Sequence, residues 1–284
     1  MTNKEAWTKF WNARLNSSIS VKVWFRSNIL KNIPTIENGY ESINNKGYKL
    51  VSDELIKDFT NITVPGNWGS ARPDMDNVFV PEMVNISDNK ITITTKAEVT
   101  VGHDWNGKES TKPTISGLVS TDAIYDMDGM YSVIINQDDY ALGSWDAWWF
   151  FDPNATPEVD PSYQEIDMIE RFYDRPSYSD RITTTVHHKT QNQPQAMYNS
   201  ALKIKGNEPY MLSIEFPKNE NKFKIYYNGM LIFIGLQWKP TRKMTMKVNS
   251  GLLARTYNQF DIKERLDIKD YFFEVSNIKH WNKN

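Results

Sequence analysis

The sequence predicts an all-β protein, built as an antiparallel sandwich or barrel. Three observations support this prediction: many short segments alternate apolar with polar residues, turn residues separate these segments, and only one helical pattern is convincing. Short strands with frequent turns and few helices are typical of sandwiches and barrels. We assign residues 51–284 to a single β domain, since such folds often reach roughly 200–250 residues.

The composition excludes several classes of protein. The chain carries 33 Lys and Arg against 35 Asp and Glu, so it lacks the basic excess that nucleic-acid binding requires. No apolar run approaches the roughly 18 residues of a membrane helix, and we predict neither nucleic acid nor membrane as a partner. The lack of cysteine excludes disulfides, thiol catalysis and cysteine-bound metals. Aromatic residues make up 13%, including ten Trp, which fits either a large aromatic core or a cleft lined with rings.

Residues 1–50 are predicted to form an N-terminal helix followed by an irregular extension. Residues 4–15 place Trp7, Phe10 and Trp11 at helical spacing, which indicates a helix that packs on the domain or contacts a partner. Residues 16–50 are rich in Asn, Ser and Lys and are expected to be irregular. The first residues lack the apolar stretch of a signal peptide, which fits a mature secreted protein or a phage-encoded one.

Strand patterns begin at about residue 77. Ile91 and Ile93 alternate with threonines, and similar alternation is found at residues 212–216, 244–248 and 271–275. The clearest hairpin joins residues 223–227 to residues 230–234 through Asn228-Gly229, a pair typical of a two-residue primed turn. Residues 103–115 and 152–163 are expected to be long surface loops.

An acidic motif, Gln-Glu-Ile-Asp-Met-Ile-Glu, occupies residues 164–170. In a strand, Glu165 and Asp167 share one face, and the apolar residues between them take the other. If the strand were regular, Glu170 would point into the core of the protein. A one-residue bulge near Met168-Ile169 would return it to the face of Glu165. Paired carboxyl groups roughly 5–5.5 Å apart are what a retaining glycosidase uses as nucleophile and general acid. The alternative is a strand edge whose acids face water.

An aromatic strand, Ser-Trp-Asp-Ala-Trp-Trp-Phe-Phe, is predicted at residues 144–151. Trp145 and Trp149 share one face of this strand, while Trp148 and Phe150 take the other. Because rings exposed in a cleft stack on sugars, we take Trp145 and Trp149 as candidate substrate-binding residues. The alternative is that rings on both faces are buried.

Together, the aromatic and acidic strands resemble those of glycoside hydrolase family 16. That family has a Trp-Pro-Ala-x-Trp-Leu strand followed by Glu-x-Asp-x-x-Glu. This chain has Trp145-Asp146-Ala147-Trp148-Trp149-Phe150 followed by Glu165-Ile166-Asp167-Met168-Ile169-Glu170, with Asp146 in place of the proline. A weaker match spans residues 77–235. The resemblance implies a concanavalin-like β-jelly roll of two curved antiparallel sheets with an open concave cleft. It also implies that Glu165 is the nucleophile, that Glu170 is the general acid/base and that Asp167 orients Glu165.

The bulged spacing resembles the laminarinase, agarase, porphyranase and carrageenase branches of that family. Gln164 directly before the acids resembles the agarases and porphyranases most. The resemblance therefore implies an endo-acting retaining hydrolase of an algal galactan such as agar or porphyran, with carrageenan and laminarin or another β-glucan as alternatives. A non-catalytic lectin-like module is the alternative outside the enzymes, because lectins share this jelly roll. We expect a monomer, found outside the cell or in the periplasm.

Four further residues are candidates for substrate binding. His187 and His188 end a predicted strand, and one of them should face the cleft, with His187 favoured. Trp68 and Arg72 lie in a loop, where a ring and a guanidinium can bind an anionic sugar or simply pack the loop. Weaker candidates of the same kind are Trp105, Arg171, Arg175 and Trp238. No metal or cofactor is predicted, although some members of the family bind a structural calcium.

Overall fold

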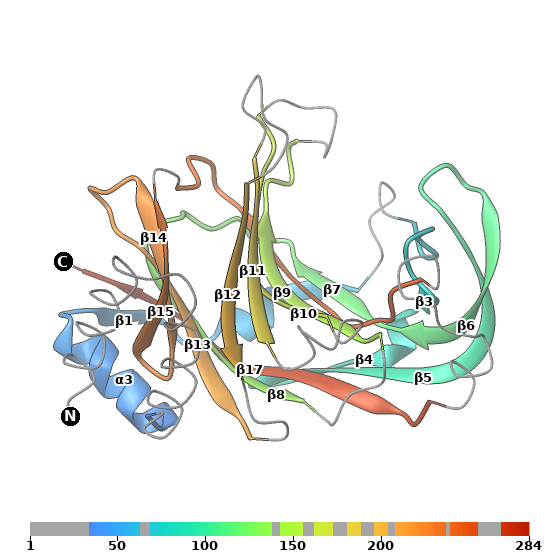
Figure 1. Cartoon of the computed structure of the whole chain (residues 1–284), viewed down its shortest axis with the longest axis horizontal. Helices are drawn as coiled ribbons and strands as arrows, with labels where there is room; N and C mark the ends of the chain where they lie inside the picture. The colour runs from blue at the N-terminus through green and yellow to red at the C-terminus, as the bar shows by residue number, and fades with distance from the viewer. Residues whose placement is uncertain are drawn as a thin grey trace, which may run out of the picture.

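The computed structural model describes residues 34–62, 69–137, 143–155, 162–172, 181–188, 196–203, 208–236, 239–254 and 268–283. Within these residues the strands form two sheets, one of ten strands and one of seven, which do not close into a barrel (Figure 1). The predicted jelly roll of two largely antiparallel sheets is confirmed.

The larger sheet contains β1 (Lys49–Ser52), β3 (Asn77–Phe79), β4 (Val84–Ser87), β5 (Lys90–His103), β6 (Glu109–Ser116), β8 (Gly129–Gln137), β13 (Tyr210–Phe216), β14 (Lys222–Tyr227), β15 (Met230–Leu236) and β17 (Tyr271–Asn282). Its order is β15-β14-β13-β8-β17-β5-β6-β3, with β1 paired to β17 and β4 paired to β5. The pairing of β3 with β6 is parallel. Two short 3₁₀ helices, η2 (Leu55–Asp58) and η3 (Pro81–Met83), lie between strands.

The smaller sheet contains β2 (Phe59–Asn61), β7 (Leu118–Thr121), β9 (Trp145–Phe151), β10 (Gln164–Phe172), β11 (Arg181–His188), β12 (Ala196–Lys203) and β16 (Thr245–Asn249). Its order is β12-β11-β10-β9-β16-β7-β2. The acidic strand β10 and the aromatic strand β9 are therefore neighbours near the middle of this sheet.

One hydrophobic core joins the two sheets. Ile91 and Ile93 of β5, Trp148 and Phe150 of β9 and Ile166 of β10 all belong to it, and each is fully buried. Burial of one such side chain contributes roughly 1.5–3 kcal/mol. Because alternate residues of β9 and β10 face this core, the remaining residues of these strands face away from it, on the opposite side of the smaller sheet.

The prediction that residues 16–50 are irregular is wrong for α3 (Ile36–Asn45). Thr35 caps this helix and forms a capping box with Asn38, which satisfies backbone groups that a polar sequence would otherwise leave open. Ile43 is buried in a second apolar cluster with Met211 and Trp281, and this packing outweighs the weak helix propensity of the Asn- and Gly-containing segment. The helix predicted at residues 4–15 lies outside the described residues.

The hairpins agree with the sequence in one case and differ in another. The turn between β14 and β15 has positive φ at Asn228 (46°) and Gly229 (77°), as a primed turn requires. Residues 103–115, predicted as a loop, are instead mostly strand, because β6 pairs with the long β5 and leaves a short turn around Gly107. In Figure 1 this hairpin stands at the end of the molecule opposite α3. No helix among the described residues is long and apolar enough to cross a membrane.

Candidate active site

The bulge predicted in the acidic strand is confirmed. Pairing of β10 with β9 shifts between Asp167 and Ile169, and pairing with β11 shifts between Asp167 and Glu170. Ile169 is consequently buried in the core, and Glu170 points to the opposite face of the sheet with Glu165 and Asp167. The three carboxyl groups form one row along β10.

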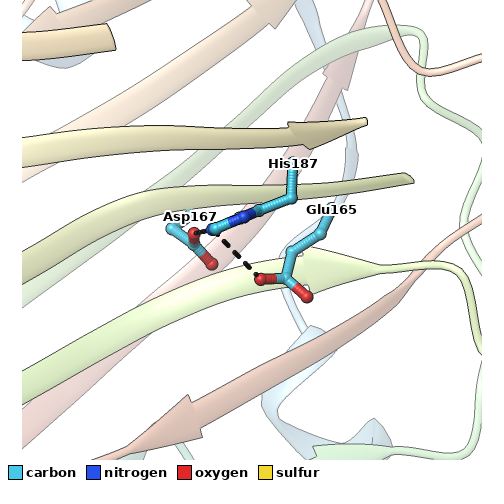
Figure 2. A group of neighbouring side chains, drawn as sticks. All are labelled: Glu165, Asp167 and His187. Atoms are coloured by element: carbon cyan, nitrogen blue, oxygen red, sulfur yellow. Dashed lines mark ion pairs between the residues drawn. The ribbon is translucent and has the colours of Figure 1, made fainter. Parts of the chain in front are cut away.

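His187 joins the first two acids of this row. It lies opposite Glu165 in the β10–β11 pairing, and its Nε2 is 3.6 Å from Glu165 Oε1 and 3.1 Å from Asp167 Oδ2 (Figure 2). On its other oxygen, Glu165 accepts a hydrogen bond from the hydroxyl of Tyr163. The preference for His187 over His188 agrees with this geometry, while the side chain of His188 lies outside the described residues.

Two neutral donors hold the third acid. Trp145 Nε1 donates a hydrogen bond of 3.1 Å to Glu170 Oε1. The hydroxyl of Thr185 donates to Glu170 Oε2. Both oxygens of Glu170 are therefore occupied by groups on the flanking strands β9 and β11, which fixes the orientation of the carboxyl group.

Burial dominates the ionisation of the row. It raises the pKa of Glu165 to about 8, with the charge of Asp167 adding to the effect and the charge of His187 opposing it. Burial and the nearby Glu170 raise the pKa of Asp167. Burial also raises the pKa of Glu170, against the hydrogen bond from Thr185, the charge of His187 and the hydrogen bond from Trp145. The row therefore retains protons at neutral pH, so it can offer both a carboxylic acid and a carboxylate.

On the same face of the sheet, the neighbours of the row come from β9 and β16. Trp149 is only 2% exposed and donates a hydrogen bond of 2.8 Å to Asn249 Oδ1. Lys247 lies opposite Trp149 in the β9–β16 pairing and is only 1% exposed. Its Nζ is 4.7 Å from the centre of the Trp149 ring and 3.9 Å from that of Phe151.

The other candidates have different surroundings. Trp145 lies beside Glu170, whereas the indole of Trp149 is buried and offers no open stacking surface. Arg72 forms two hydrogen bonds with Asp74, at 2.9 and 2.7 Å, so its guanidinium already has a partner within its own loop. Trp105 is 48% exposed in the turn between β5 and β6. The described residues do not include Trp68, Arg175, Trp238 or the side chain of Arg171.

Tyr163, Thr185 and Lys247 also lie at the site, although the sequence alone does not single them out. Tyr163 fell in a predicted loop, and Thr185 was one of three consecutive threonines. Lys247 lies between the apolar alternating residues Met246 and Val248, which places it on the face of its strand away from the core, and the strand order then brings that face beside the acids.

Glu165, Asp167 and His187 also form a group that could hold a metal ion. One nitrogen or oxygen from each lies within 4.8 Å of the others, and no second group of this kind occurs among the described residues. That no metal is needed stays a prediction.

Comparison with known proteins identifies the fold. No protein-family model and no curated protein sequence matches the chain. The laminarinase catalytic domain of Thermotoga maritima is 15% identical, with 84% of this chain and 99% of that one covered and a TM-score of 0.59. LamAcat of Zobellia galactanivorans is 17% identical over the same shares, with a TM-score of 0.63. The κ-carrageenase of Pseudoalteromonas carrageenovora, solved with a κ-carrageenan oligosaccharide, is 16% identical over 80% of this chain and 92% of that one, with a TM-score of 0.56.

Proposed function

We propose that this chain, which has the fold of the family 16 glycoside hydrolases, is an endo-acting retaining hydrolase of a β-linked polysaccharide. The observation that carries the proposal is the bulge in β10, which brings Glu165, Asp167 and Glu170 to one face of the sheet beside His187. A strand with three acids on one face, two of them buried and the third only partly exposed, is costly for a fold, because like charges at this spacing cannot all ionise. Such an arrangement is expected where the acids perform chemistry.

In the first step, Glu170 acts as the acid and Glu165 as the nucleophile. The carboxylate of Glu165 attacks the anomeric carbon, and the bond from that carbon to the glycosidic oxygen breaks. Glu170 gives its proton to the departing oxygen, so the leaving sugar is released as an alcohol. Burial supports this role, because it raises the pKa of Glu170 and keeps the proton available.

In the second step, Glu170 acts as the base. It takes a proton from water, the water oxygen attacks the anomeric carbon, and the ester bond to Glu165 breaks, which restores the original configuration. Donors to Glu170 from Trp145 and Thr185 support the carboxylate form that this step needs. Tyr163 and His187 support the carboxylate of Glu165 in the same way.

For the substrate, we propose an algal galactan of the agar or porphyran type. This rests on the sequence pattern around Gln164, whose side chain is occupied within the protein: it donates to Thr241 Oγ1 and accepts from the Thr241 backbone, each at 2.9 Å. A β-glucan such as laminarin is the second candidate, favoured by the nearly complete coverage of two laminarinase-type structures. Because a polysaccharide is too large to enter a cell intact, we expect the protein outside the cell or in the periplasm.

The test is the release of reducing ends from agarose, porphyran, κ-carrageenan, laminarin and mixed-linkage glucan. We expect one polymer to be cleaved, and Glu165→Gln and Glu170→Gln to lose at least about 100-fold in turnover while remaining folded. Glu82→Gln, at an exposed acid of η3, is the matched control and should retain full activity. Proton NMR of the first products should show the β-anomer.

Three outcomes would contradict the proposal in different ways. Full turnover in either active-site variant would remove these residues from the mechanism. An α-anomer as first product would exclude retention. Binding of a polymer without new reducing ends would instead support the lectin-like alternative.

A further inference from the structure

The side chains of Glu165, Asp167 and His187 converge on the face of the smaller sheet that points away from the core (Figure 2). Glu165 and Asp167 lie two residues apart on β10, and His187 pairs with Glu165 from β11. One nitrogen or oxygen from each residue lies within 4.8 Å of the others. Because all three residues belong to neighbouring strands of one sheet, the backbone pairing fixes their spacing.

The distances between these atoms match those around a tetrahedral divalent ion. His187 Nε2 is 3.1 Å from Asp167 Oδ2 and 3.6 Å from Glu165 Oε1. Zn²⁺ binds nitrogen and oxygen at about 2.0–2.2 Å, so two of its ligands at the tetrahedral angle lie roughly 3.3–3.6 Å apart. Both observed distances agree with this range to within about 0.2 Å, which is the agreement expected of a metal site.

One of the three ligand atoms lacks a hydrogen-bond donor. Asp167 is 4% exposed, and its Oδ2 accepts no hydrogen bond within the part of the chain that the structure describes. The contact with His187 Nε2 is close, but it does not have the geometry of a hydrogen bond. A buried carboxylate oxygen without a donor is costly, and a bound ion is one of the groups that satisfy such an atom.

The surroundings of the three residues support a bound ion and give it access. Tyr163 donates a hydrogen bond to Glu165 Oε2, while Oε1 is the oxygen that faces His187. Carboxylates that bind metals are commonly held by such outer hydrogen bonds. The side chains of His187 and Glu165 are 27% and 16% exposed, so an ion can enter from solvent and keep a water as its fourth ligand.

The three donor groups also select the kind of ion. An imidazole nitrogen suits Zn²⁺, Ni²⁺ and Cu²⁺, and two carboxylates balance the double positive charge of such an ion. Ca²⁺ and Mg²⁺ instead take about six or more oxygen ligands, which two carboxylates and one imidazole do not supply. The site therefore favours a divalent transition-metal ion over the alkaline-earth ions.

We propose that Glu165, Asp167 and His187 form a binding site for a divalent transition-metal ion such as Zn²⁺, and that the bound ion inhibits hydrolysis. The inhibition rests on the proposed function, whereas the binding does not. An ion bound to Glu165 occupies the oxygen lone pair that attacks the anomeric carbon, so the first step is blocked for as long as the ion stays. The ion is thus an inhibitor that competes with the substrate, and catalysis does not require it.

The first experiment measures the binding of Zn²⁺ alone, by isothermal titration calorimetry on protein freed of metal by a chelator. We expect one ion per chain for wild type, and binding at least about 100-fold weaker for His187→Gln, which loses the nitrogen ligand. Tyr163→Phe removes only the outer hydrogen bond to Glu165 and should weaken binding about tenfold. Ca²⁺ and Mg²⁺ should not displace Zn²⁺ from wild type.

His103→Gln is the matched control for the loss of the histidine ligand. His103 is exposed, and its Nε2 lies 3.9 Å from Glu109, so it is another histidine close to an acid. This variant should bind Zn²⁺ as wild type does. Circular dichroism shows whether each variant is folded, and Tyr163→Phe provides the test if His187→Gln is not. Equal weakening in His103→Gln and His187→Gln, or no binding by wild type, would overturn the site.

The second experiment measures hydrolysis of the polymer that wild type cleaves, with and without Zn²⁺. With the ion at about ten times its Kd and the polymer below its KM, the rate should fall about tenfold and return when EDTA is added. A rate that falls with EDTA and returns with Zn²⁺ would overturn the inhibitory role. Zn²⁺ binding without cleavage of any polymer would refute the proposed function and leave the site standing, whereas cleavage without Zn²⁺ binding would do the reverse.

Discussion

The indole N–H of Trp145 donates a hydrogen bond of 3.1 Å to Glu170 Oε1, across the boundary between β9 and β10. The contact depends on the bulge, because without it Glu170 would point into the core and Trp145 would have no acid beside it. The aromatic and acidic motifs are therefore parts of one arrangement. The tryptophan that the sequence suggests as a sugar platform is also a donor to the proposed general acid.

Loss of this donor should change the ionisation of Glu170. The hydrogen bond lowers the pKa of Glu170, so Trp145→Phe should raise it. A hydrogen bond to a charged group contributes roughly 1.5–3 kcal/mol, and the shift should be about one pH unit. We expect the alkaline limb of kcat/KM to move to higher pH, because the acid keeps its proton longer. Thr185→Val removes the second donor and should shift the limb in the same direction.

Trp149→Phe is the matched control for this shift. It also removes an indole N–H, but that group donates to Asn249 and not to an acid. Its alkaline limb should coincide with that of wild type. If Trp145→Phe and Trp149→Phe moved the limb equally, the hydrogen bond to Glu170 would not be the cause.

Two substitutions beside Glu165 should act in opposite directions. The charge of Asp167 raises the pKa of Glu165, and the charge of His187 lowers it. Asp167→Asn should therefore move the acid limb of kcat/KM to lower pH, and His187→Gln should move it to higher pH, each by about one unit. The measurement is a pair of pH profiles in a buffer of constant ionic strength. Shifts of the same sign would show that the ionisation of Glu165 does not set the acid limb.

Much of the acidic strand could be predicted from the sequence because it depends on local rules. Alternation placed Glu165 and Asp167 on one face, and the odd spacing of Glu170 required a bulge. The Asn228-Gly229 turn followed from its residue types in the same way. These features depend only on residues close together in the sequence, and the structure contains each of them.

The parts that could not be predicted depend on contacts between distant segments. Helix α3 forms because Ile43 packs on Met211, a residue of β13 far away in the chain. The surroundings of Lys247 depend on the strand order β16-β9-β10, which alternation within one strand does not specify. Local patterns therefore predicted the acids and favoured His187, but they did not identify Tyr163, Thr185 or Lys247 around them.

Asp146 stands where family 16 has proline. We expect it to lower the free energy of unfolding as the pH rises from about 4 to 7. It is buried and accepts a hydrogen bond of 2.6 Å from Ser250, and burial raises its pKa to about 7 even though this bond opposes the rise. Between about pH 4 and 7 the unfolded chain has lost this proton and the folded chain still holds it. Stability contributed by the protonated acid is therefore present at low pH and is lost as the pH rises toward 7.

Asp146→Asn should remove this loss, because the amide stays neutral at every pH while keeping an oxygen for Ser250. The stability difference between the variant and wild type should grow in favour of the variant from pH 4 to pH 7, by roughly 1.4 kcal/mol per pH unit at most, and stay constant above. Urea denaturation at a series of pH values measures it, with Asp88→Asn, at an exposed turn between β4 and β5, as the control that should show no such trend. A difference that is independent of pH would mean that Asp146 is ionised in the folded protein, stabilised by its buried hydroxyl neighbours.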